Sequence, residues 1–166
     1  FRLFEERLRQ STLCVSLKKR SHSLAFKLHP VLAADCIQLG QFELCRVLLM
    51  NDANYPWLIL VPQVDGVREV FELSDSQQLQ LIDESHYVLK ALNDTFKADK
   101  MNQAALGNMV PQLHIHHVVR YKNDAAWPAP VWGKVASVAY GKEELERMIA
   151  KVNNALSNHQ NYHLYE

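Results

Sequence analysis

A chain of 166 residues has room for one domain with a real core, and 48% hydrophobic and 22% charged residues are ordinary globular values. The 18 basic and 18 acidic residues cancel, so charge gives no reason to expect nucleic acid or an anionic membrane as partner. No stretch approaches the roughly 18 apolar residues of a transmembrane helix. Three cysteines, an odd number without a Cys-x-x-Cys pair, favour a reducing, cytoplasmic compartment.

The chain begins with a basic stretch, residues 1–22, whose short apolar part does not reach the length of a secretion signal. We expect it to be an N-terminal extension or a tail introduced by cloning, and we expect residues 23–166 to form a single domain. The next segment starts at Pro30 and predicts a short helical turn before Gly40. Gln41–Met50 and Trp57–Pro62, joined by turn-forming residues, predict an antiparallel hairpin.

The clearest helix follows Ser74, a predicted N-cap with Gln77 completing a capping box. Helical spacing predicts one buried face for this helix, with His86 on it as a half-buried core histidine. The predicted face consists of Leu79, Ile82, His86, Leu89 and Phe96.

The last third of the chain predicts a strand, an irregular loop and a second helix. The strand covers residues 112–121, and Pro128 and Pro130 exclude regular structure from the loop after it. The second helix has an apolar face made of Leu145, Met148, Ile149, Val152 and Leu156. The order of elements indicates an α+β fold with an antiparallel sheet.

Three histidines lie in the stretch VPQLHIHHVVRYK, which otherwise is typical of a buried strand. Because side chains on a strand alternate between faces, Gln112, His114 and His116 are predicted on one face and His117 on the other. The row could be an exposed surface by chance. It could also supply two metal ligands, although zinc usually needs a third. In the third reading, a neutral imidazole attacks phosphorus or a carbonyl, and a second, protonated imidazole stabilises the negative charge.

The histidine strand, the preceding LGNMVPQL, the hairpin NDANYPWLILVPQ and the helix start ELS together resemble the histidine-triad (HIT) family over about residues 26–120. The family signature is His-φ-His-φ-His-φ-φ, where φ is apolar. The resemblance implies a five-stranded antiparallel sheet with two main helices, usually paired as a homodimer. It also implies nucleotide substrates, cleaved at the α-phosphate through a nucleotidyl-histidine intermediate.

The resemblance also implies roles for single residues. His114 aligns with the nucleophile, His116 with a phosphate-binding ring, and Gly107 and Asn108 with a phosphate-binding pair. Asn51 and Asp52 align with the ribose-binding position, and Asn102 is a further candidate for substrate binding. Gln112 replaces the first histidine, and it can form hydrogen bonds but cannot carry a proton.

We therefore expect a nucleotide hydrolase or nucleotidyl transferase that works through nucleotidyl-His114, without cofactor or metal, and with no nucleic-acid or membrane partner. One alternative is a nucleotide-binding module with lost or weak turnover, because Gln112, Trp57 and Met109 replace family residues. A less favoured alternative is a metal-dependent hydrolase using His114 and His116. The loop residues Trp127 and Trp132 either cover the domain's own core or contact a second subunit.

Overall fold

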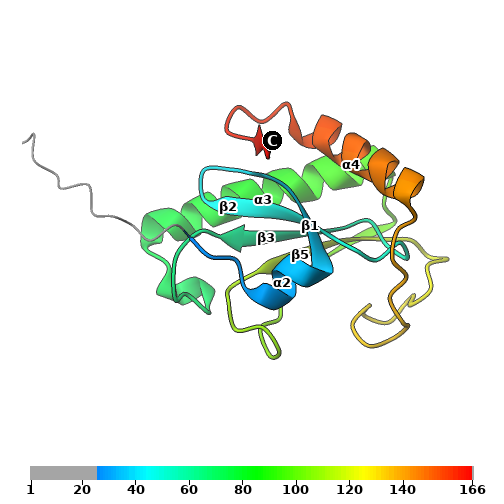
Figure 1. Ribbon diagram of the computed structural model, residues 1–166, viewed down its shortest axis with the longest axis horizontal. Helices are drawn as coiled ribbons and strands as arrows, with labels where there is room; N and C mark the ends of the chain where they lie inside the picture. The colour runs from blue at the N-terminus through cyan, green and yellow to red at the C-terminus, as the bar shows by residue number, and fades with distance from the viewer. Residues whose placement is uncertain (1–25, 166) are drawn as a thin grey trace, which may run out of the picture.

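The structure, a computed structural model, describes residues 26–165, so the predicted N-terminal extension lies outside the described residues. An antiparallel sheet of six strands in the order β4-β5-β3-β2-β1-β6 forms its centre (Figure 1). The strands are β1 (Cys36–Gln41), β2 (Cys45–Met50), β3 (Trp57–Pro62), β4 (Lys100–Ala105), β5 (Ile115–Arg120) and β6 (His163–Leu164). The helices are α2 (Pro30–Asp35), α3 (Asp75–Phe96) and α4 (Lys142–Leu156), with a 3-10 turn η1 (Val70–Glu72) before α3.

These elements confirm the predicted α+β class, the hairpin of β2 and β3 and the two main helices. The sheet has six strands rather than five, because the two-residue β6 pairs with β1 at one edge. The predicted helical turn after Pro30 is α2, whereas β1, which follows it directly, was not predicted from the sequence.

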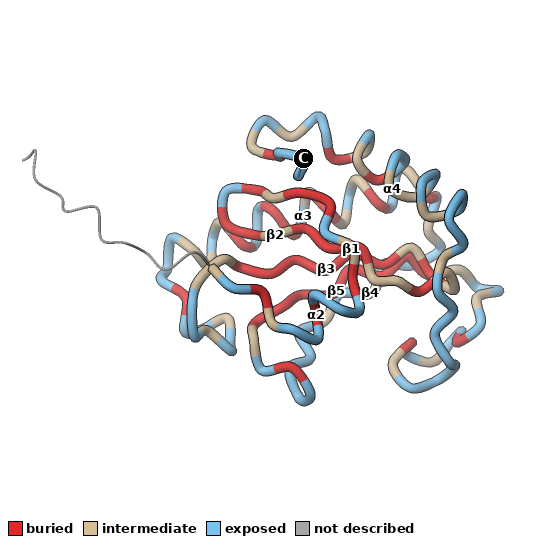
Figure 2. The backbone as a smooth tube through the Cα atoms, viewed as in Figure 1, coloured by how far each residue is buried: buried red, intermediate tan, exposed pale blue. Residues whose placement is uncertain are grey.

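The sheet separates two apolar cores. On one face, α3 and α4 pack against residues such as Val47, Leu58 and Val119. On the other face, Leu48, Ile59 and Val118 pack against α2 and the loops around residues 110 and 131. Figure 1 shows α3 behind the sheet and α2 in front of it, and Figure 2 shows that the central strands are the most buried part of the backbone. The α2 face lacks a long covering helix, so it is the face on which a pocket can form.

Helix α3 begins as predicted, with a capping box between Ser74 and Gln77, but only part of the predicted face is buried: Phe96 lies in the core and Leu89 is half-buried. Leu79 and Ile82 are 65% and 47% exposed, and His86 is exposed rather than half-buried in the core. The buried face contains two polar residues: Glu84 accepts from two backbone N–H groups of the β1–β2 turn region, and Ser85 contacts His117. Because these polar residues have buried partners, the periodicity of the apolar residues alone predicted only part of the buried face.

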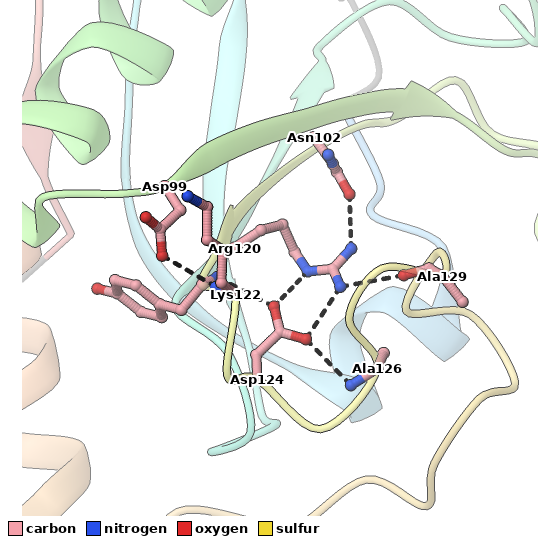
Figure 3. A network of polar contacts seen from close by, with 8 residues as sticks. Asp99, Asn102, Arg120, Lys122, Asp124, Ala126 and Ala129 are labelled. Carbon is pink, nitrogen blue, oxygen red and sulfur yellow. Dashed lines mark hydrogen bonds and ion pairs between the residues drawn. The ribbon is translucent and has the colours of Figure 1, made fainter.

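A buried ion pair fixes the loop that follows β5 (Figure 3). Arg120 donates to both carboxylate oxygens of Asp124, at 2.6 and 2.9 Å, and to the carbonyl of Ala129 at 3.0 Å. The guanidinium also lies over the ring of Trp127, 5.7 Å from its centroid. This network holds the loop against the sheet and so places Trp132, a few residues later, beside the histidines.

Candidate active site

A pocket of about 400 Å³ opens on the α2 face of the sheet. The sheet contributes Trp57, Ile59 and His116, and the loop before β5 contributes Asn108 and His114. The other lining residues are mostly apolar: Val31, Leu32, Asp35, Cys36, Met50, Leu106, Met109, Val110 and Trp132. An apolar pocket with a few converging polar groups is the usual form of a small-molecule site.

The two predicted catalytic histidines lie side by side in this pocket. Their ring centroids are 4.8 Å apart, and both side chains are buried. His116 lies on β5, an inner strand between β4 and β3, while His114 directly precedes that strand. His117 lies on the opposite face, where its Nε2 is 2.6 Å from the hydroxyl of Ser85 on α3. The prediction that His114 and His116 share a face that opens to a pocket is confirmed.

One hydrogen bond determines which nitrogen of His114 carries the proton. Its Nδ1 lies 2.6 Å from the carbonyl oxygen of Gln112. Since a carbonyl can only accept, Nδ1 must be the donor, and a neutral ring then has its lone pair on Nε2. No residue of the described chain hydrogen-bonds this Nε2, so it is free for a ligand in the pocket.

His116 is neutral rather than protonated, contrary to the expectation for the second imidazole. Burial, together with the neighbouring His114 and His117, lowers its pKa to about 3. Its Nδ1 accepts a hydrogen bond of 3.0 Å from the indole N–H of Trp57. Any stabilisation of negative charge by His116 therefore comes from an N–H dipole and not from a full positive charge.

The side chain of Gln112 does not continue the row of histidines. The strand starts only at Ile115, and the amide of Gln112 points to the segment before α2 instead. Its Oε1 accepts from the backbone N–H of His29 at 2.8 Å, and its Nε2 donates to the carbonyl of Lys27 at 3.1 Å. Gln112 thus links the segment before α2 to His114, which its own carbonyl orients. Its side chain lies toward α2, on the side of the sheet that carries the two histidines, but it lies outside the strand and bonds the neighbouring segment instead of extending the row.

A second hollow of about 310 Å³ adjoins the pocket, and it is more polar. It is lined by Gln112 and His114, by Gly107 and Asn108, and by the charged residues Arg68 and Glu69, together with Ala105, Leu106 and Leu113. Asn108 lines both hollows, so the structure brings the predicted phosphate-binding pair next to the candidate nucleophile.

Three predicted substrate-binding residues do not line either hollow and have protein partners instead. Asn51 accepts from the backbone N–H of Tyr140, and Asp52 accepts from that of Val138, so both hold the segment that leads into α4. Asn102 accepts from Arg120 at 2.7 Å (Figure 3). The one acidic residue among those that line the pocket is Asp35, at the end of α2.

Sequence reasoning missed Asp35 because nothing in its local pattern differs from an ordinary helix end. Trp132, also missed as a pocket residue, packs against His116 and Trp57 with ring centroids 5.3 and 5.7 Å away. Of the two readings for the loop tryptophans, Trp132 therefore fits the one in which it covers its own domain.

Residues 26–165 contain no group of three or more His, Cys, Asp or Glu side chains placed to hold a metal ion. The metal reading of His114 and His116 thus finds no third protein ligand in this part of the chain. Of the helices in the same range, none has the length and apolarity needed to cross a membrane.

Comparison with known proteins identifies the family. The HIT domain family model matches residues 32–123. The solved structure of a histidine triad protein from Marinobacter aquaeolei VT8 is similar, with 53% identity and a TM-score of 0.78 over 80% of this chain and 97% of that chain. A histidine triad protein from Bradyrhizobium japonicum has 44% identity and a TM-score of 0.77 over 79% of this chain and 98% of its own.

A more distant structure shows the fold alone: a hypothetical histidine triad nucleotide-binding protein from Sulfolobus tokodaii strain 7 is 16% identical, with a TM-score of 0.55 over 72% of this chain and 85% of that chain. No curated protein sequence matches the chain. The family model covers more than half of the chain, and the histidine pair, the fold and the identity to solved histidine triad proteins agree with it, so this chain belongs to the HIT family.

Proposed function

We propose that the protein is a nucleotide hydrolase or nucleotidyl transferase that acts at the α-phosphate through a nucleotidyl-His114 intermediate. The observation that carries this proposal is the bond between Nδ1 of His114 and the carbonyl of Gln112, which leaves the lone pair of Nε2 free in the pocket. A neutral imidazole with an oriented, unpaired Nε2 is a competent nucleophile near pH 7.

The reaction proceeds in two displacements. Nε2 of His114 forms a bond to the α-phosphorus, and the bond from phosphorus to the leaving group breaks with its electron pair on the leaving group. Water then attacks the nucleotidyl-His114 phosphorus, which releases the nucleoside monophosphate and restores the imidazole. The N–H of His116 and the amide of Asn108 donate to the nonbridging oxygens, where preorganised donors lower the barrier most.

The larger pocket holds the nucleoside in this proposal. Its lining is mainly apolar, which suits a base, and the carboxylate of Asp35 accepts from a ribose hydroxyl in place of the predicted Asn51 and Asp52. The pocket volume of about 400 Å³ lies in the range of small-molecule sites.

A specific observation favours a second candidate, a nucleotide-binding module with weak turnover. Met109 stands where part of the family has a hydroxyl residue that protonates the leaving group, and this thioether is 92% exposed and has no proton to give. A leaving group that takes its proton from water removes this requirement, so the two candidates separate by which substrates turn over.

The test is a panel of adenosine and guanosine phosphoramidates, dinucleoside polyphosphates and adenylylated compounds. We expect His114→Ala to abolish turnover while nucleotide affinity persists, because a covalent nucleophile contributes mainly to the transition state. We expect His116→Ala to weaken binding as well and to lower the rate by about 10²–10³. His86→Ala, at an exposed histidine on α3, is the matched control and should behave as the wild type. Full turnover by His114→Ala on every cleaved substrate would show that the mechanism is wrong, whereas wild-type binding without any turnover would support the binding module.

The proposed setting is a cytoplasmic homodimer. The described cysteines, Cys36 and Cys45, are free and buried, which supports a reducing compartment. Strand β4 is an edge of the sheet, and the exposed Ile82 lies one turn before Ser85, which contacts Gln103 of β4. The exposed Leu79 and Ile82 of α3, near an open edge of the sheet, support pairing with a second copy. Sedimentation should give a dimer for the wild type and a monomer for Ile82→Glu. Val138→Glu, at another exposed apolar residue, is the control and should remain a dimer. A wild-type monomer at micromolar concentration would contradict the dimer.

A further inference from the structure

Trp57 stands where the HIT resemblance leads one to expect a histidine, and its indole is held firmly beside His116. The side chain is buried at the start of β3. Its ring packs edge-on against Tyr55, His116 and Trp132, with centroids 6.4, 5.4 and 5.7 Å away. Its N–H donates to Nδ1 of His116 over 3.0 Å. The donor therefore has little freedom to turn away from the imidazole.

We propose that Trp57 is a positioning residue that holds the single proton of the neutral His116 ring on Nε2, so that the phosphate site offers an N–H dipole throughout the working pH range. An indole nitrogen can only donate, so Nδ1 of His116 must be the acceptor. A proton on Nδ1 would break this bond and leave two N–H groups facing each other in a buried site. The inference rests on the proposed function for its consequence in catalysis, but the protonation state of His116 can be observed without a substrate.

The other groups around His116 do not stabilise a second proton, on Nδ1, strongly enough to overcome the loss of the Trp57 bond. The ring of His114 is 4.8 Å away and donates its own Nδ1 proton to Gln112. His117 is buried on the opposite face. Across the pocket lie the Asp35 carboxylate and the Cys36 thiol, whose pKa burial raises to about 12. The pocket lining holds no Lys or Arg, and burial lowers the pKa of His116 to about 3.

A consequence for the reaction follows from this arrangement. His116 is left with no role in proton exchange with the substrate during turnover. It should therefore contribute no ionisation to the kcat/KM profile between pH 5 and 9.

The direct test is ¹⁵N–¹H long-range NMR of the ligand-free protein with labelled histidine, because the two ring nitrogens report the tautomer. We expect His116 to show a neutral Nε2–H ring that does not titrate between pH 5 and 9. In Trp57→Phe, which keeps an aromatic ring and removes the donor, we expect mixed tautomers of neutral His116. The same variant should lose about two- to tenfold in kcat/KM, the equivalent of one hydrogen bond.

Trp132→Phe is the matched control for the spectrum, since it removes an indole that packs on the same ring without a bond to it. Its His116 signals should stay in the Nε2–H form. An Nδ1–H ring in the wild type, titration of wild-type His116 between pH 5 and 9, or an unchanged spectrum in Trp57→Phe would each overturn the inference. The wild-type spectrum decides even if Trp57→Phe does not fold. Absence of turnover on every substrate, with the expected spectrum, would count against the proposed function alone.

Discussion

Replacing Gln112 by alanine tests how the pocket wall is held. The side-chain amide forms two hydrogen bonds to the segment before α2, one from the His29 N–H at 2.8 Å and one to the Lys27 carbonyl at 3.1 Å. Each is worth about 0.5–1.5 kcal/mol net, and both lie close enough to solvent for water to replace part of the loss. We therefore expect about 1–2 kcal/mol less stability for the closed segment, which makes its opening roughly 5–30 times more frequent.

Hydrogen exchange of the His29 amide measures this opening directly, because that N–H is the donor to Gln112. Gln112→Ala should speed its exchange by the stated factor and weaken nucleotide affinity more than kcat, since the backbone carbonyl that orients His114 remains. Gln112→His should give an exchange rate and a nucleotide affinity between those of the wild type and Gln112→Ala. A neutral imidazole has one donor and one acceptor on opposite sides of its ring, so it cannot bond the His29 N–H and the Lys27 carbonyl in the same way as the amide. Gln160→Ala, at an exposed glutamine, is the control. Unchanged exchange and affinity in Gln112→Ala would refute the reasoning.

The remaining predictions concern buried charges that hold the fold. Asp124→Asn leaves Arg120 without its counter-charge in a site only 2–3% exposed, so the free energy of unfolding in urea should fall by about 3–5 kcal/mol, and a loss below about 1 kcal/mol would contradict the buried ion pair. Although burial acts in the opposite direction, hydrogen bonds from Arg120 and two backbone N–H groups lower the pKa of Asp124. The ionised carboxylate should therefore stabilise the fold above the unfolded pKa of about 4, and this stabilisation should disappear as the pH falls through the lower folded pKa. Asp124→Asn should therefore flatten the acid side of the stability curve. Glu84→Ala leaves the N–H groups of Leu44 and Cys45 unpaired in the core and should cost about 2–4 kcal/mol, whereas the exposed Glu146→Ala should change stability by less than about 0.5 kcal/mol.

The parts of the fold that the sequence predicted well are those with strong local signals. The hairpin of β2 and β3 combines two apolar runs with a dense turn, and Ser74 and Gln77 mark the start of α3 through their reciprocal hydrogen bonds. Strand β1 has no such signal. Its burial does not alternate regularly, and its pairing with β2 is interrupted by a bulge near Gly40, so the period-two pattern of a strand is absent from its sequence.

The buried face of α3 shows why periodicity fails when polar groups are satisfied inside a core. Glu84 is fully buried because two backbone donors and Gln80 bind its carboxylate. An apolar count excludes such a position from the core and instead selects Leu79 and Ile82, which are exposed. Local patterns cannot reveal these partners, since the donors lie about 40 residues away in the chain.

The candidate site also contains residues that could be found from the sequence and residues that could not. His114 and His116 could be found from the sequence, because alternation near one strand places them together whatever the rest of the fold does. The proposed ribose contact, Asp35, could not be found in this way, because it depends on where α2 lies relative to the sheet. Asn51 and Asp52 are turn residues whose side chains bind the segment before α4, whereas Asp35 reaches the pocket from a helix that only the tertiary structure places there.

The two departures from the family pattern near the histidines, Gln112 and Trp57, have one property in common. Each replaces an imidazole by a group that forms hydrogen bonds but does not titrate. The Gln112 amide holds the pocket wall while its carbonyl fixes the His114 tautomer, and the Trp57 indole donates to His116. Both rings have a hydrogen-bond partner at Nδ1, and no residue of the described chain hydrogen-bonds either Nε2. On the proposed function, the replacements therefore change which groups exchange protons with the substrate, and they keep the proposed nucleophile and the proposed phosphate donor in place.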